Sequence, residues 1–267
     1  MKEDSKPTWK LNTVSKAISV LRAFDNQNPE WTLAALSAKF GLPKTTMLGT
    51  LRTLECNGFL YRTQNQSYRL GLDILELGYF LQTSLPISKL VLPLLEEIQV
   101  ATGNFVYLTI PKNGKVFYLE CAYPGEKKIN YSIVGKTLPM HCNSCGKAML
   151  SEFPNEQVEK VVETYGLPKF TPNTITDFSV LRKQLDIIKL RGFATENGER
   201  TIGTKCVGIP VKSNSGKLLG ALSIAGPSIR MPDDRVDEFV GLLSNASMIL
   251  SENETIFPTC SPYPIEV

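Results

Sequence analysis

The sequence predicts an α+β protein in which a winged helix-turn-helix precedes a larger domain of helices and antiparallel strands. Near the N-terminus, two helical patterns meet at a glycine turn and are followed by a hairpin pattern. Further along, helical patterns alternate with pairs of β-type runs. Positive charge collects in the first part: residues 1–70 hold ten Lys and Arg against five Asp and Glu, whereas residues 71–267 hold nineteen against twenty-one.

Composition limits the classes of protein to consider. The 267 residues, 42% of them apolar, suit two modest domains. No stretch approaches the ~20 consecutive apolar residues of a membrane span, and the start, MKEDSKPTWK, lacks the apolar core of a secretory signal. We therefore expect a cytoplasmic protein with reduced cysteines and no membrane partner. The basic first part indicates a polyanionic partner.

The first two helices are predicted from apolar spacing and from the residues that bound them. Pro29, in the polar turn DNQNPE, separates the two helices. Thr32 can cap the second helix, and Gly41 can end it in a left-handed conformation. The apolar stripes are Val14, Ile18, Leu21 and Phe24 in the first helix, and Leu33, Leu36 and Phe40 in the second.

A third helix and a wing complete the first domain. Pro43 suits the first turn of the helix, and ECNG closes it. Its buried stripe is predicted to be Met47, Leu51 and Leu54. After Gly58, the runs FLYRT and SYRLG flank a polar QNQ turn, which predicts a two-stranded hairpin.

The third helix leaves a polar face away from its apolar stripe. Short hydroxyls and a lysine at a helix N-terminus suit contacts with phosphates and base edges in a major groove. The alternative is a solvated face of a small helical bundle. The helix-turn-helix spacing, the hairpin and the charge bias favour double-stranded DNA as the partner. The candidate DNA-binding residues are Lys44, Thr45, Thr46, Thr50, Arg52 and Thr53.

A helix is predicted for LDILELGYFLQTSL, which precedes Pro86. One interpretation is a linker helix with a dimer seam, and the alternative is a helix that packs on its own domain. The apolar positions of this helix are Leu72, Leu75, Leu77 and Phe80.

The rest of the chain contains two further hairpins and two long helices. NFVYLTI and KVFYLECA flank a Pro-Lys-Asn-Gly turn, and CVGIPVK and LLGALSIAG flank SNSGK. TDFSVLRKQLDIIKLRG is an amphipathic helix that ends at Gly192, and DDRVDEFVGLLSNASMILSENE is the final helix. The proline-containing tail, residues 256–267, is expected to be loose.

The segment MHCNSCGKAML holds the only histidine of the chain. His141, Cys142 and Cys145 could form a zinc site with Cys206, or a thiol sensor. However, Cys206 lies sixty-one residues beyond Cys145, and no second local cysteine pair exists. Covalent catalysis lacks a nameable third partner, so we expect neither an enzyme nor a bound metal.

The favoured interpretation of this segment is the edge of a ligand pocket. SCGKAML resembles the start of a helix entered from a loop. Free backbone N–H groups of Ser144, Cys145 and Gly146 would then point into a cavity. Such a helix N-terminus favours a carboxylate.

Several segments together resemble the IclR family of bacterial transcriptional regulators. The resemblance begins in VSKAISVLRAF, TLAALSAKFGLPKTTMLGTLRTLECNGFL and YRLGLDILELG, and it continues through LPMHCNSCGKAML, RGFATENGERTIGTKCVGIPV and LGALSIAGPSIRMPDDRV. It implies a winged helix-turn-helix at 10–71, a linker helix at 72–86 and a GAF-like effector-binding domain at 87–255. It also implies a homodimer or homotetramer without a cofactor.

The resemblance also implies which residues contact the effector. They are Ser144, Cys145, Glu196, Thr204, Cys206, Ser223 and Ala225, to which the N-terminus interpretation adds Gly146. For Cys206 and Ala225 the alternative is ordinary core packing. We expect a small organic acid with a donor group at its far end, such as a hydroxy acid or a sugar acid, because Glu196 would repel a second carboxylate.

Three positions depart from the family pattern. Gly49 stands where relatives often carry a large polar residue, commonly arginine, so the operator sequence cannot be transferred from them. Glu196 replaces the usual Asp or Ser, and Ala225 replaces the Ser of some members. Both changes alter the volume and the hydrogen-bonding groups of the predicted pocket.

Overall fold

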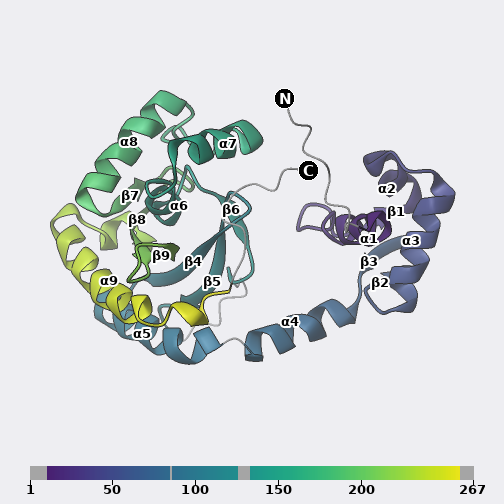
Figure 1. Ribbon diagram of the computed structural model, residues 1–267, viewed down its shortest axis with the longest axis horizontal. Helices are drawn as coiled ribbons and strands as arrows, with labels where there is room; N and C mark the ends of the chain where they lie inside the picture. The colour runs from purple at the N-terminus through teal and green to yellow at the C-terminus, as the bar shows by residue number, and fades with distance from the viewer. Residues whose placement is uncertain (1–10, 85, 126–132, 259–267) are drawn as a thin grey trace. The chain divides into compact units, whose positions relative to one another are not determined.

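The computed structural model describes residues 11–84, 86–125 and 133–258 (Figure 1). The chain divides into two compact units, residues 1–84 and residues 85–267, and each has a hydrophobic core of its own. Most of the predicted loose tail, residues 259–267, lies outside the described residues. Within the described ranges, no helix combines the length and apolarity needed to cross a membrane.

The first unit is the predicted winged helix-turn-helix. Its core contains Leu36, Met47 and Leu51, which are completely buried. The three strands form a small antiparallel sheet in the order β1-β3-β2, in which β1 was not predicted. The elements are α1 (Asn12–Leu21), β1 (Trp31–Thr32), α2 (Leu33–Phe40), α3 (Lys44–Cys56), β2 (Leu60–Arg62) and β3 (Ser67–Leu70).

Local chemistry sets the ends of α2 as predicted. The Thr32 hydroxyl accepts a hydrogen bond of 3.2 Å from the Ala35 N–H, and Gly41 adopts a left-handed φ of 61°. The predicted stripe of α1 is wrong in part, because Val14 and Ile18 are 52% and 43% exposed. The helix instead turns Val20 into the core, where it packs with α2 and α3.

Helix α4 (Leu72–Ser84) follows the wing and contains no buried residue. It coincides with the predicted linker helix. Ile74 is half-buried, and the other large apolar side chains are more than half exposed: Leu72, Leu75, Leu77, Tyr79, Phe80 and Leu81. The alternative interpretation, in which this helix packs on its own unit, has little support, because α4 contributes no buried residue to the core of the first unit.

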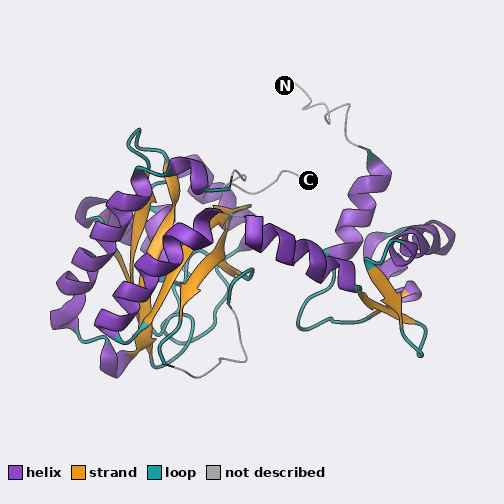
Figure 2. Ribbon diagram, turned by 90° about the horizontal axis from the view of Figure 1, so that it is seen from below, coloured by secondary structure: helices purple, strands orange, loops and turns teal. Residues whose placement is uncertain are grey.

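The second unit is built on a six-stranded antiparallel sheet with the strand order β6-β5-β4-β9-β8-β7. Figure 2 shows these strands flanked by helices. The strands are β4 (Phe105–Lys112), β5 (Lys115–Ala122), β6 (Thr137–Pro139), β7 (Ala194–Asn197), β8 (Thr204–Lys212) and β9 (Leu218–Pro227).

Helices cover both faces of the sheet (Figure 1). Helices α5 (Pro86–Thr102) and α9 (Val236–Ser251) pack on one face through Leu95, Phe239 and Leu243. Helices α6 (Ser144–Leu150), α7 (Asn155–Tyr165) and α8 (Phe178–Arg191) form the layer on the other face. Short 3-10 turns, Ser228–Arg230 and Asp233–Arg235, lead into α9, and Glu254–Ile256 follows it.

Both predicted hairpins are present. Asn113 and Gly114 connect β4 to β5 with positive φ values of 52° and 73°, the conformation of a type I′ turn. Gly192 ends α8 with a φ of 81°, also as predicted.

Helix α6 is short and entirely buried, and a glycine allows its close packing. A Cβ on Gly146 would lie 2.2 Å from the Met140 carbonyl oxygen. No side chain larger than hydrogen fits there without moving the helix. By contrast, Gly49 in α3 has no atom within 4 Å of a Cβ built on it.

Because of this contrast, a change of glycine to alanine should have opposite effects on stability at the two positions. We expect Gly49→Ala to stabilise α3 by ~1 kcal/mol because alanine has the higher helix propensity. Gly146→Ala should destabilise the second unit by roughly 1–3 kcal/mol or more, because of overpacking. Urea denaturation of the full chain, with hydrogen exchange to separate the two units, measures both. Equal effects at the two positions would contradict the packing described for α6.

Candidate functional site

Helix α3 presents a polar face to solvent. Lys44, Thr45, Thr46, Arg52 and Thr53 are exposed, and Thr50 is half-buried. Neither charged side chain of this set forms an ion pair within the described part of the chain. The two cations are therefore available to a polyanion.

Two threonine hydroxyls of this face bond back to the helix. Thr50 donates to the Thr46 carbonyl at 3.2 Å, and Thr53 donates to the Gly49 carbonyl at 2.9 Å. Their hydroxyl oxygens can still accept a hydrogen bond, but their protons are engaged. Lys44 and Arg52 are thus the stronger candidates for contacts with phosphate groups.

A cavity of about 360 Å³ lies in the second unit, on the face of the sheet that packs against α6. All six strands contribute to its walls. Its volume is in the range of small-molecule sites. The lining residues are Phe105, Tyr107, Tyr118, Ile133, Leu138, Asn143, Glu196, Arg200, Thr201, Gly203, Thr204, Cys206, Ala225, Gly226 and Pro227.

The cavity brings together half of the predicted effector residues, namely Glu196, Thr204, Cys206 and Ala225. The other four, Ser144, Cys145, Gly146 and Ser223, are buried and lie outside the lining. The thiol of Cys145 donates to the Ser223 hydroxyl at 3.0 Å, so these two side chains contact each other.

The expectation of free N–H groups at the start of α6 is wrong for Gly146. Its N–H donates to the Asn143 side-chain oxygen at 2.7 Å, a normal N-terminal cap. The Asn143 amide nitrogen in turn donates to the Pro139 carbonyl at 2.6 Å. Asn143 therefore lines the cavity with its polar groups already bonded.

Glu196 stabilises the loop that forms one rim of the cavity. The residue is 2% exposed, and its carboxylate accepts hydrogen bonds from the N–H groups of Glu199 and Arg200, the latter at 3.2 Å. Burial and the Glu196 carboxylate raise the pKa of the neighbouring Cys206 thiol well above its ordinary value. Cys206 therefore stays a thiol and can donate to the carboxylate.

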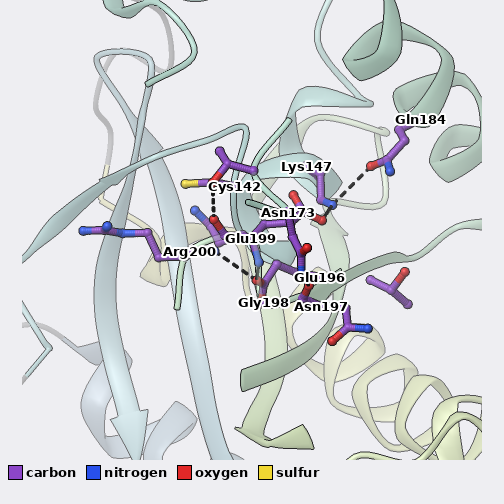
Figure 3. A network of polar contacts seen from close by, with 12 residues as sticks. Cys142, Lys147, Asn173, Gln184, Glu196, Asn197, Gly198, Glu199 and Arg200 are labelled. Carbon is purple, nitrogen blue, oxygen red and sulfur yellow. Dashed lines mark hydrogen bonds and ion pairs between the residues drawn. The ribbon is translucent and has the colours of Figure 1, made fainter. Parts of the chain in front are cut away.

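A buried ion pair joins this loop to α6 (Figure 3). The Lys147 ammonium lies 2.5 Å from the Glu199 carboxylate and 3.2 Å from the Gln184 side-chain oxygen of α8. Lys147 is completely buried. Burial raises the pKa of the Glu199 carboxyl, and the Lys147 charge opposes that rise.

A second segment holds the loop from the opposite side. The Thr171 hydroxyl donates to the Gly198 carbonyl at 2.6 Å, and the Thr174 hydroxyl donates to the Glu199 carbonyl at 2.6 Å. The Asn173 amide also reaches the Asn197 carbonyl, as Figure 3 shows. The backbone leading to Arg200 is therefore fixed by hydrogen bonds on two sides.

The His141–Cys142–Cys145 cluster gives no support to the zinc-sensor or thiol-sensor hypothesis. Within residues 11–84, 86–125 and 133–258, no three His, Cys, Asp or Glu side chains converge on a possible metal position. The His141 imidazole lies 3.1 Å from the Pro168 carbonyl, and Cys142 faces the Pro139 carbonyl. Burial raises the pKa of the Cys142 thiol to about 12, which disfavours the reactive thiolate.

Comparisons with known proteins identify the family of the chain. The model of the IclR helix-turn-helix domain matches residues 13–64, and that of the bacterial transcriptional regulator IclR C-terminal domain matches residues 80–252. The chain belongs to the IclR family. It shares 28% identity with the HTH-type transcriptional regulator XynR of Escherichia coli over 90% of this chain and 96% of that protein. Proteins of this family are transcriptional regulators and not enzymes.

Solved IclR structures share the fold. The IclR transcriptional regulator of Alicyclobacillus acidocaldarius matches 91% of this chain and 98% of its own, with a TM-score of 0.76 and 26% identity. An IclR homolog of Microbacterium hydrocarbonoxydans, solved with 4-hydroxybenzoate, matches 91% and 98% with a TM-score of 0.71 and 24% identity.

Sequence reasoning missed Arg200 and the aromatic residues of this IclR-family cavity. A signal existed for two of them, since Phe105 and Tyr107 alternate in NFVYLTI and so share a face of β4. No pattern singled out Tyr118 or Arg200, because their place at the cavity depends on sheet pairing and on the loop.

The buried ion pair predicts a large, pH-dependent stability loss in Lys147→Met. Removal of one partner leaves a buried carboxylate without compensation, which costs about 3–5 kcal/mol. The pKa of Glu199 is raised in the folded state, so folding favours its protonated form, and stability falls as the pH rises above the ordinary carboxyl range. Removal of Lys147 takes away the charge that opposes the rise in the Glu199 pKa, so the loss in Lys147→Met should be larger at pH 8 than at pH 5, as urea denaturation can measure.

Lys212→Met is the matched control. Lys212 forms a more exposed pair with Glu152 at 3.2 Å, and such surface pairs contribute about 0–1 kcal/mol. Equal losses in the two variants, or a loss in Lys147→Met that does not depend on pH, would contradict the assignment.

Proposed function

We propose that this IclR-family regulator binds a specific DNA operator through α3 and that a small organic acid in the cavity of the second unit controls this binding. The observation that carries the proposal is the combination, in one chain, of an unpaired cationic helix face and a cavity of ligand size. We infer a winged helix-turn-helix at 10–71, a linker helix at 72–86 and an effector domain at 87–255. DNA binding would place the protein in the cytoplasm.

The DNA contacts follow from the placement of α3 after the turn at Gly41. In this arrangement the N-terminal part of the second helix of the motif enters the major groove. Lys44 and Thr45 lie in that part, and Arg52 and Thr53 lie farther along. Gly49 offers no side chain to a base, so we expect the operator to differ from those of arginine-bearing relatives.

The apolar surface of α4 supports a homodimer. Large side chains such as Leu75 and Phe80 are 72% and 54% exposed, and monomers rarely expose such a continuous patch. A second copy of the chain is the partner that we propose for it. The two winged helix-turn-helix units of a dimer would bind two half-sites of the operator, which supplies the sequence specificity that a single unit lacks.

The cavity supports control by an effector. Glu196, Thr204, Cys206 and Ala225 line it, and we propose that they contact the ligand. The IclR homolog solved with 4-hydroxybenzoate supports the idea that this fold can hold a small acid. A ligand that binds one arrangement of the dimer more tightly than another would shift the population toward that arrangement and so change how the two winged helix-turn-helix units are placed on DNA.

The test of DNA binding is operator selection from random duplexes, followed by fluorescence anisotropy at several salt concentrations. We expect steep salt weakening, because each neutralised phosphate adds ~0.9 to the log–log slope. Lys44→Ala and Arg52→Ala should each lower the affinity and the slope. Lys189→Ala, an exposed charge change on α8, is the control and should alter neither. No selectable operator, or a slope unchanged in the Lys44→Ala/Arg52→Ala double variant, would refute the proposed placement of DNA.

The assembly is tested by light scattering at micromolar concentration. We expect a dimer or larger for the natural chain and a smaller species for Leu75→Asp/Phe80→Asp, because charges would then be buried in an apolar seam. Gln82→Asp adds a charge to the same helix without removing apolar surface and should leave the assembly intact. A monomeric natural chain would refute the seam.

A further inference from the structure

Three polar side chains that line the cavity already have partners within the chain. Asn143 bonds the Gly146 N–H and the Pro139 carbonyl, and Glu196 accepts two backbone N–H groups. The Thr204 hydroxyl donates to the Thr201 carbonyl at 2.6 Å. A ligand must therefore be recognised mainly by the groups that remain.

One cation remains available at the cavity. The Arg200 guanidinium carbon lies 3.9 Å from the centre of the Phe170 ring. In Figure 3 the side chain extends away from the Lys147–Glu199 pair. Among the described residues, no oxygen accepts a hydrogen bond from this guanidinium. Its N–H donors match the two oxygens of a carboxylate.

The Phe170 ring, on which Arg200 stacks, is packed against a further residue. The Phe170 ring stacks with the His141 ring at 6.1 Å and 28°, and His141 contacts the Pro168 carbonyl. The backbone N–H of Arg200 is bonded to Glu196. Both ends of the arginine are therefore held while its donors stay open, the preorganised state that favours ligand binding.

The remaining walls are aromatic and aliphatic. Phe105 and Tyr107 stack at 6.1 Å and 11°, and Tyr107 meets Tyr118 edge to face at 5.2 Å and 88°. Ile133, Leu138 and Ala225 complete the apolar surface. A sugar acid would leave most of its hydroxyls without partners here, whereas a flat ring would bury apolar area against the walls.

We propose that Arg200 binds the carboxylate of the effector and that the effector is an aromatic acid of one or two rings. The proposal rests on the effector-binding function proposed above and narrows it, since a volume of about 360 Å³ holds such a molecule. Burial raises the pKa of the Tyr107 and Tyr118 hydroxyls, so both stay protonated and can bond a ring substituent.

The position of Glu196 sets the orientation of the ligand. The residue is buried and its carboxylate is bonded to the loop backbone, so it holds the rim in place instead of binding the acid. It still repels a negative charge placed beside it. The Arg200 guanidinium is the cation that can offset this repulsion, so the carboxylate of the ligand lies against it and the ring lies toward Tyr107 and Ala225.

The experiment is calorimetry on the full chain with benzoate, phenylacetate, 3-hydroxybenzoate and 4-hydroxybenzoate. Each acid that binds is compared with its neutral amide, and cyclohexanecarboxylate and gluconate are the non-aromatic controls. We expect at least one aromatic acid to bind roughly tenfold or more tightly than its amide, because a charged hydrogen bond is lost in the amide. The two non-aromatic acids should bind more weakly than that aromatic acid.

The role of Arg200 is read from the ratio of acid to amide affinity. Arg200→Gln should lower acid affinity roughly tenfold to a hundredfold and bring the ratio close to one, while amide affinity changes little. Arg200→Lys should recover part of the ratio. Phe170→Leu should lower the ratio less than Arg200→Gln, because the guanidinium then loses its support and not its charge. Arg182→Gln, which removes a surface arginine paired with Glu159, is the control.

Three outcomes would overturn the proposal. They are an acid-to-amide ratio unchanged in Arg200→Gln, equal binding of gluconate and the aromatic acids, and no binding of any aromatic acid. In each case, specific operator binding by the same preparation would leave the regulator function standing. Binding of an aromatic acid without any operator binding would instead refute the regulator function and keep the ligand assignment.

Discussion

The ion pair between Lys147 and Glu199 ties together the parts that form the cavity. A completely buried ammonium is tolerated only with a close counter-charge, so α6 and the loop after β7 must stay in register with each other. Gln184 extends the same contact to α8. Since the loop also carries Arg200, the pair contributes to the shape of the rim together with the hydrogen bonds that Glu196 and Thr171 make to the loop.

The polar groups of the cavity are of two kinds, those already hydrogen-bonded within the chain and those still available to a ligand. Asn143 and Glu196 line the cavity, but their oxygens hold backbone N–H groups of α6 and of the loop. The Arg200 guanidinium makes no such bond within the described residues and rests on Phe170. A residue at a cavity wall is thus not automatically a ligand contact, and the difference lies in whether its hydrogen-bonding capacity is already used.

The two units differ in how completely they bury their apolar side chains. The second unit buries two apolar layers on the faces of its sheet, whereas α4 in the first unit buries none of its large side chains. An uncovered apolar helix is unfavourable in water and gains stability when a partner covers it. A second copy of the chain, the partner proposed above, would bury this apolar surface of α4.

Short-range sequence patterns were sufficient to predict most local elements of this IclR-family chain. Thr32, Gly41 and the Asn113–Gly114 turn set their conformations through their own backbone and cap chemistry, so pattern reasoning predicted α2, α3 and the hairpins. Contacts between segments that are distant in the sequence set which face of α1 is buried and which polar groups of the cavity are free. The Gly146 N–H is bonded to Asn143, Glu196 holds the loop backbone and the Arg200 guanidinium rests on Phe170, because each partner depends on packing between segments and not on the spacing of residue types.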